Sequence, residues 1–144
     1  DMGIEPHLIV GAINGVMAQR LVRTMCQKCM MEDREGAEIF ARLWKKETGR
    51  EPVTTAGPLR FNKSSGCTAC NHTGFQGRTG IFELFIPNEE MKRCIIERDT
   101  RQLYKIAVAG GMTTMMMDGL LKAAQGVTSI AEVFRVTGET SEGL

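Results

Sequence analysis

The sequence lacks both an excess of charge and a long apolar segment. Its 144 residues include 18 basic and 17 acidic side chains, for a formal net charge of +1, and only 6% of the residues are aromatic. Because the charges nearly cancel, bulk charge gives no support to binding of nucleic acid or of a membrane surface. No apolar run approaches the roughly 20 residues of a membrane span, so we expect no direct membrane insertion.

Catalytic motifs are lacking too. The pattern G-x-x-x-x-G-K-[ST] does not occur, so the chain has no loop of this kind to hold a triphosphate. With two histidines and no serine in a G-x-S-x-G turn, no nucleophile–base pair is evident. The neighbouring acids Glu89 and Glu90 suit the first turn of a helix. We therefore predict a binding or structural module without catalytic residues and without residues that bind an organic cofactor.

The N-terminal segment and the number of cysteines indicate the cellular compartment of the protein. The N-terminal segment has neither the basic region nor the cleavage site of a secretory signal. Five cysteines are an odd number for a disulfide framework. We therefore expect a cytoplasmic, reducing compartment. The abrupt start at Asp1 indicates a fragment of a longer protein.

Hydrophobic spacing predicts an α+β fold that is mostly helical, with one or two short strands. Apolar residues at helical spacing predict helices over 7–23 and 32–48. The best strand is 79–86, and a short one over 59–61 precedes the second cysteine pair. Further helices are expected over 89–98, 101–109, 113–125 and 130–136, with N-caps at Asn88, Thr100 and Ser129.

Four of the five cysteines form two C-x-x-C pairs, Cys26-Gln27-Lys28-Cys29 and Cys67-Thr68-Ala69-Cys70. A spacer of two residues lets a tight turn aim both sulfurs at one point, and two such turns complete a tetrahedral Cys₄ shell around Zn²⁺. Protein would fill all four positions, which is typical of a structural zinc site and not of a hydrolytic one. We therefore predict a zinc knuckle in which Cys26, Cys29, Cys67 and Cys70 bind one structural Zn²⁺.

Other interpretations of single residues stay open. The paired cysteines are alternatively buried free thiols or a redox pair, although a redox C-x-x-C needs a thioredoxin-like βαβ context that the sequence does not predict. His72 is an alternative ligand, but with four cysteines at hand a surface or supporting role is favoured. Cys94 falls on an apolar helix face and is predicted to be a small buried hydrophobe. The consecutive Met115–Met117 cannot all face one core, so core filling and a partner surface are both candidate roles.

Several segments of the sequence together match the pattern of a known protein family. They are Asp1–Pro6 and Ala18–Arg23 before the first cysteine pair, Gly66–Leu84 around the second pair, and then Gly111–Leu120, Gly126–Ser129 and Glu132–Thr137. In this combination they resemble the ATPases of type II secretion and type IV pilus assembly. The resemblance covers nearly the whole chain.

The resemblance implies that the chain is the C-terminal part of such an ATPase, detached from a RecA-like core. The family's motor assembles as a hexamer at the cytoplasmic face of the inner membrane and uses ATP and Mg²⁺ to drive assembly of a pilus or pseudopilus. Residues 1–24 would be the helical end of the core, 25–78 the tetracysteine zinc-binding subdomain, and 79–144 a strand plus a C-terminal helical subdomain. Implied partners are the inner-membrane platform, other proteins of the secretion or pilus machinery, and adjacent subunits of the hexamer.

Two other kinds of zinc module are alternatives. A zinc ribbon that binds nucleic acid needs basic and aromatic residues near the knuckle. Arg20, Arg23, Lys28 and Arg34 supply charge, but aromatic side chains are few, so we expect no nucleic-acid partner. A chaperone-type module is the second alternative, because Cys67–Gly74 weakly resembles the C-x-x-C-x-G-x-G repeats of J-domain chaperones, although only one imperfect copy is present.

Overall fold

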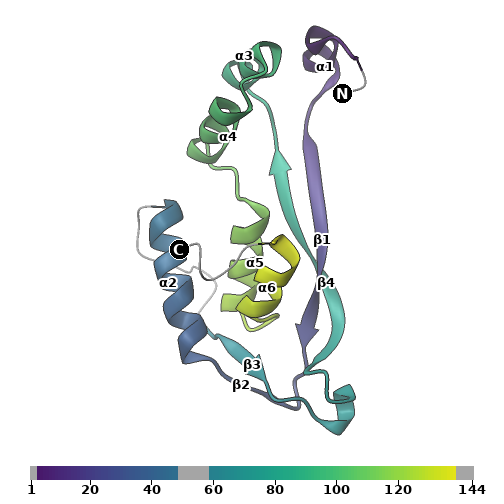
Figure 1. Ribbon diagram of the computed structural model, residues 1–144, viewed down its shortest axis with the longest axis vertical. Helices are drawn as coiled ribbons and strands as arrows, with labels where there is room; N and C mark the ends of the chain where they lie inside the picture. The colour runs from purple at the N-terminus through teal and green to yellow at the C-terminus, as the bar shows by residue number, and fades with distance from the viewer. Residues whose placement is uncertain (1–2, 49–58, 139–144) are drawn as a thin grey trace. The chain divides into compact units, whose positions relative to one another are not determined.

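The computed structural model describes residues 3–48 and 59–138, which Figure 1 draws in colour. In chain order they form α1 (Pro6–Ala12), β1 (Val16–Met25), β2 (Met30–Glu32), α2 (Arg34–Thr48), β3 (Asn62–Ser64), the 3₁₀ turn η1 (Thr68–Cys70), β4 (Phe75–Phe85), α3 (Glu89–Glu97), α4 (Thr100–Ala109), α5 (Met115–Ala124) and α6 (Ile130–Thr137). The predicted α+β class, mostly helical, is confirmed. None of the helices in these ranges has the length and apolar character needed to cross a bilayer.

The helix predicted over 7–23 is wrong beyond its first two turns. α1 ends at Ala12, because Ile13 already has an extended backbone (φ −83°, ψ 122°), and the strand β1 begins at Val16. β1 pairs with β4, far away in sequence, and such long-range pairing overrides a local helical spacing of apolar residues. Gly15 fits this pairing, since a Cβ there would lie 3.3 Å from the carbonyl oxygen of Phe85.

The other strands also differ in part from the prediction. β4 contains most of the predicted strand 79–86 but begins at Phe75. The strand predicted over 59–61 lies instead at β3, which is antiparallel to β2 with Ser64 opposite Met30. Phe61 points into the core and is only 7% exposed. Polar residues of β3 have weak strand propensity, so the pairing with β2 decides where this strand lies.

The helix starts are mostly as predicted. Asn88 and Ser129 cap α3 and α6 through side-chain hydrogen bonds of 2.9 and 3.2 Å from backbone N–H groups. α4 begins at Thr100, but its cap is Asp99, whose carboxylate accepts from the Gln102 N–H at 2.9 Å. Thr and Asp are both good N-caps, so the prediction of Thr100 as the cap is off by one residue.

Contacts divide the chain into two compact units, each discontinuous in sequence: one comprises 1–18 and 82–114, the other 19–81 and 115–144. In the first unit α3 packs against α1 and α4, and Met91, Cys94 and Ala107 are buried. The burial of Cys94 confirms its predicted role as a small hydrophobe. The boundaries expected near 24 and 78 concern the domains of a parent protein and stay a prediction.

The second unit contains the main hydrophobic core, formed by α2, α5 and α6, which lie side by side in Figure 1. Leu43 of α2, Leu120 of α5 and Val133 of α6 are fully buried there. Gly119 allows α5 and α6 to approach closely, because a Cβ at this residue would lie 2.7 Å from Cγ1 of Val133. Since α2 lies between the two cysteine pairs in sequence, the cysteine region and the last two helices share one core.

The consecutive methionines at the start of α5 also contribute to this core. Met117 is buried, Met116 packs partly against the core, and Met115 is half-buried. Core filling therefore accounts for Met116 and Met117.

Candidate metal centre

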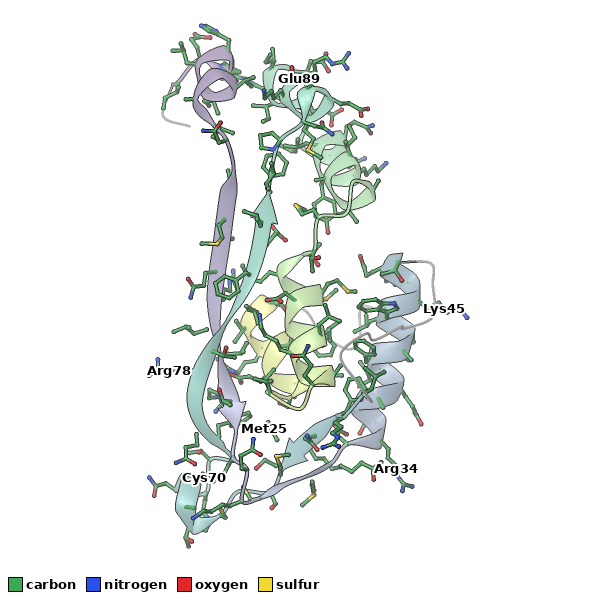
Figure 2. All side chains as sticks on the ribbon, turned by 180° about the vertical axis from the view of Figure 1, so that it is seen from behind. Met25, Arg34, Lys45, Cys70, Arg78 and Glu89 are labelled. Atoms are coloured by element: carbon green, nitrogen blue, oxygen red, sulfur yellow. The ribbon has the colours of Figure 1, made fainter. Side chains whose placement is uncertain are left out.

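The two C-x-x-C pairs meet in the second unit, near the end of β1 that Met25 marks in Figure 2. The four Sγ atoms of Cys26, Cys29, Cys67 and Cys70 all lie within 4.8 Å of one another. The Cys26–Cys67 distance is 3.9 Å, and the Cys29–Cys70 and Cys67–Cys70 distances are both 3.8 Å. A tetrahedron with Zn–S bonds of about 2.3 Å has sulfur–sulfur edges of about 3.8 Å, whereas a disulfide needs about 2.05 Å. The geometry therefore suits a tetrahedrally bound cation.

Each pair lies on a tight turn. In the first turn the N–H groups of Cys29 and Met30 donate to the Cys26 carbonyl at 3.3 and 3.1 Å. In the second turn, η1, the His72 N–H donates to the Cys67 carbonyl at 2.8 Å. The chain leaves η1 through left-handed conformations at Asn71, His72 and Gly74, which turn it back into β4.

Backbone hydrogen bonds join the turns to each other and to the core. The Cys26 N–H donates to the Gly74 carbonyl at 3.0 Å, which ties the first turn to the second. The neighbouring Met25 N–H donates to the Val127 carbonyl at 2.9 Å, just before α6. The cysteine cluster is therefore attached to the loop between α5 and α6 as well as to the strands.

The thiols of Cys70 and Cys29 differ in acidity. Burial opposes ionisation of Cys70, but N–H donors from Cys67 and Gly74, both 3.2 Å from its Sγ, outweigh it and lower the pKa of Cys70 to about 6. The hydrogen bond from Ser64 favours the thiolate of Cys29, but burial and the three neighbouring thiols together raise the pKa of Cys29 to about 11. Only thiolates bind the metal, so a cation that binds at neutral pH must displace the proton of Cys29.

The structure places the other candidate ligand outside the cluster. Within the described residues, the group of His, Cys, Asp and Glu side chains that could hold an ion at this position comprises the four cysteines alone. His72 is exposed on the turn that follows Cys70.

A second polar cluster was not predicted from the sequence. Glu132 on α6 is completely buried and accepts from the Arg23 backbone N–H at 3.0 Å and from the Arg23 Nη2 at 2.7 Å. It also accepts from Nε and Nη2 of Arg135, both at 2.7 Å. Burial opposes the ionisation of Glu132, but the hydrogen bonds from Arg135 and Arg23 outweigh it and lower the pKa of Glu132 from 4.5 to about 2. This network fixes β1, just before the first cysteine pair, onto α6.

The sequence signals for this network were ambiguous. The spacing of Ser129 and Glu132 predicts a capping box, and its first half is present, because Ser129 Oγ accepts from the Glu132 N–H. The carboxylate of Glu132 binds arginines instead of closing the box. Arg135, three residues further along the same helix, was the available hint. Arg23, whose guanidinium lies 4.1 Å from the centre of the Phe75 ring, comes from a distant strand.

The fold and the cluster define an α+β module with four cysteines positioned to bind a metal ion. The family model described as "Type II/IV secretion system protein" matches residues 1–135, and the chain belongs to this family. It is 39% identical over 143 residues to the type II secretion system ATPase E of Vibrio cholerae, covering 97% of this chain and 26% of that protein. It is 36% identical over 140 residues to the type IV pilus assembly ATPase PilB of Thermus thermophilus, covering 96% of this chain and 15% of that protein. The chain thus spans about a quarter or less of the length of these relatives.

Proposed function

We propose that this chain is the C-terminal structural and interaction module of a hexameric traffic ATPase that powers pilus or pseudopilus assembly. The observation that carries the proposal is the combination of family membership over residues 1–135 with four sulfurs at tetrahedral spacing. The module contributes no catalytic residues of its own. In the full-length parent, ATP and Mg²⁺ bind to the part of the protein that precedes this chain.

The metal is Zn²⁺ in this proposal. Four thiolates are soft ligands, and a tetrahedral S₄ set is typical of zinc or iron, whereas Mg²⁺ and Ca²⁺ prefer oxygen. Cys26, Cys29, Cys67 and Cys70 would fill the whole coordination shell, so no position is left for a reacting water. When bound, the ion supplies folding free energy rather than chemistry, because it crosslinks two turns that are separated in sequence by α2.

Exposed apolar side chains support a role within a larger assembly. Met17 on β1 is 64% exposed, Leu84 on β4 is 51% exposed, and Ile86 just after β4 is 63% exposed. Such residues are candidates to pack against the remaining part of the parent, the adjacent subunits of its hexamer, or the inner-membrane platform and other machinery proteins. The parent would act at the cytoplasmic side of the inner membrane. The nucleic-acid and chaperone alternatives have no comparable support.

The experiment compares two activities of the full-length parent. Cys29→Ser removes one thiolate and should impair pilus or pseudopilus assembly more than basal ATP hydrolysis, because the metal centre holds structure and not the reacting nucleotide. Cys94→Ala, which alters a buried cysteine in the other unit, is the matched control and should keep both activities. Equal loss of assembly and hydrolysis in Cys29→Ser would contradict the proposal. The 144-residue chain alone should release no phosphate from Mg-ATP above a buffer control, and turnover that survives repurification would also contradict it.

A further inference from the structure

The second cysteines of the two pairs receive different hydrogen bonds. Cys70 Sγ accepts two backbone N–H groups, from Cys67 and Gly74, each at 3.2 Å. The corresponding N–H groups of the first turn, those of Cys26 and Asp33, donate instead to the carbonyls of Gly74 and Phe61, at 3.0 and 2.8 Å. In the described part of the chain no backbone N–H donates to Cys29 Sγ. The sulfur of Cys29 therefore lacks the support that its counterpart has.

The side chain of Ser64 on β3 lies beside Cys29 Sγ and can donate to it in place of a backbone N–H. The Ser64 Oγ lies 3.1 Å from Cys29 Sγ. β-sheet register explains the contact, because Ser64 at the end of β3 is paired with Met30, the residue after Cys29. The contact also depends on a glycine: a Cβ at Gly74 would lie 2.6 Å from Ser64 Oγ.

The direction of this hydrogen bond follows from the chemistry of the two groups. A metal-bound sulfur is a thiolate and has no proton to donate, so the Ser64 hydroxyl must be the donor. The same hydroxyl oxygen accepts a hydrogen bond from the Gly66 N–H at 3.3 Å, so the hydroxyl proton is free to point toward Cys29 Sγ. Accepting this hydrogen bond polarises the hydroxyl and makes it a better donor. A donor to a thiolate ligand stabilises its negative charge and fixes its orientation toward the metal.

We propose that Ser64 is a supporting residue of the metal centre, whose hydroxyl donates to the Cys29 thiolate in place of a backbone N–H. This inference rests on the proposed function of the four cysteines as a zinc site. Partners of this kind affect metal affinity about 10–100-fold when they are removed. A single neutral hydroxyl belongs at the lower end of that range, so we expect Ser64→Ala to weaken zinc binding about 10-fold.

The test uses the 144-residue chain and three variants. Ser64→Ala removes the hydroxyl, Ser64→Thr keeps it, and Ser65→Ala is the matched control at the exposed neighbouring serine. Zinc affinity is measured by competition with a chromogenic chelator. Co²⁺ is then substituted for zinc, and the thiolate-to-cobalt charge-transfer band is recorded, because a more electron-rich sulfur absorbs at lower energy.

The proposal predicts weaker zinc binding and a lower-energy cobalt band for Ser64→Ala alone, with Ser64→Thr and Ser65→Ala close to the wild type. Wild-type affinity and an unshifted band in Ser64→Ala would overturn it. Equal losses in Ser64→Thr and Ser64→Ala would also overturn it, because packing and not the hydroxyl would then be responsible. If the wild-type chain itself binds no zinc, the proposed metal centre fails, which is a different result from either of these.

Discussion

Replacement of Glu132 by glutamine should destabilise the second unit by about 3 kcal/mol at neutral pH. Glutamine has nearly the same shape as glutamate but carries no charge, so it leaves the hydrogen-bonding groups of Arg23 and Arg135 facing a neutral acceptor. The carboxylate is completely buried and accepts four hydrogen bonds, three of them at 2.7 Å. Breaking a fully buried ion pair costs about 3–5 kcal/mol. The side chains of Arg23 and Arg135 are 42% and 57% exposed, so the loss falls at the lower end of that range.

The depressed pKa of Glu132, which reflects the same hydrogen bonds, corresponds to a stabilisation of similar size. The pKa of Glu132 falls from 4.5 to about 2 on folding, and a shift of this size corresponds to about 3 kcal/mol. Because the folded-state pKa is the lower one, this stabilisation is complete above pH 4.5 and is lost as the pH falls from there to about 2. The difference in unfolding free energy between wild type and Glu132→Gln should therefore shrink over that window.

Urea denaturation at a series of pH values measures this difference directly. Any effect of zinc release at low pH acts on both proteins and cancels when they are compared. Glu89→Gln is the matched control, because Glu89 forms a 2.7 Å ion pair with Lys92 but its side chain is 85% exposed; exposed pairs contribute at most about 1 kcal/mol. The reasoning is refuted if Glu132→Gln is no worse than Glu89→Gln at pH 7, or if its deficit stays constant from pH 5 to pH 2.

Two further predictions concern packing and the reach of the metal. Gly119→Ala should lower the free energy of unfolding measured in urea by about 1–2 kcal/mol, because the cost of overpacking against Val133 exceeds the gain in helix propensity. The control Gly11→Ala, where a Cβ meets nothing within 4 Å, should be neutral or stabilising. Equal effects of the two substitutions would mean that α5 and α6 do not pack closely at Gly119. Chelation of the metal should remove hydrogen-exchange protection around the cysteines. The loss should extend to the start of α6 through the Met25–Val127 hydrogen bond, while α3 and α4 keep their protection. Loss of protection in α3 and α4 would show that zinc holds the whole fold.

Local chemistry made part of the fold predictable from the sequence. The C-x-x-C spacing identified the four cysteines that the structure brings together, because each pair is built within one turn. Asn88 and Ser129 were recognisable as caps, since a cap acts on N–H groups two or three residues away. Amphipathic spacing likewise located α2.

Features that depend on distant partners were not predictable in this way. The apolar residues of β1 fitted a helical period, and only pairing with β4 makes them a strand. Ser64 and Arg23 carry no local signal for their roles, because their partners Cys29 and Glu132 come from other elements. The shared core of α2, α5 and α6 likewise depends on contacts between helices that lie far apart in the sequence.

The central claim is that the four paired cysteines hold one structural Zn²⁺. Zinc K-edge X-ray absorption on the purified 144-residue chain, combined with elemental analysis after dialysis, tests it most directly. We expect about one zinc per chain with four sulfur neighbours near 2.3 Å. Absence of retained metal, or a first shell in which a nitrogen such as that of His72 replaces a sulfur, would contradict it.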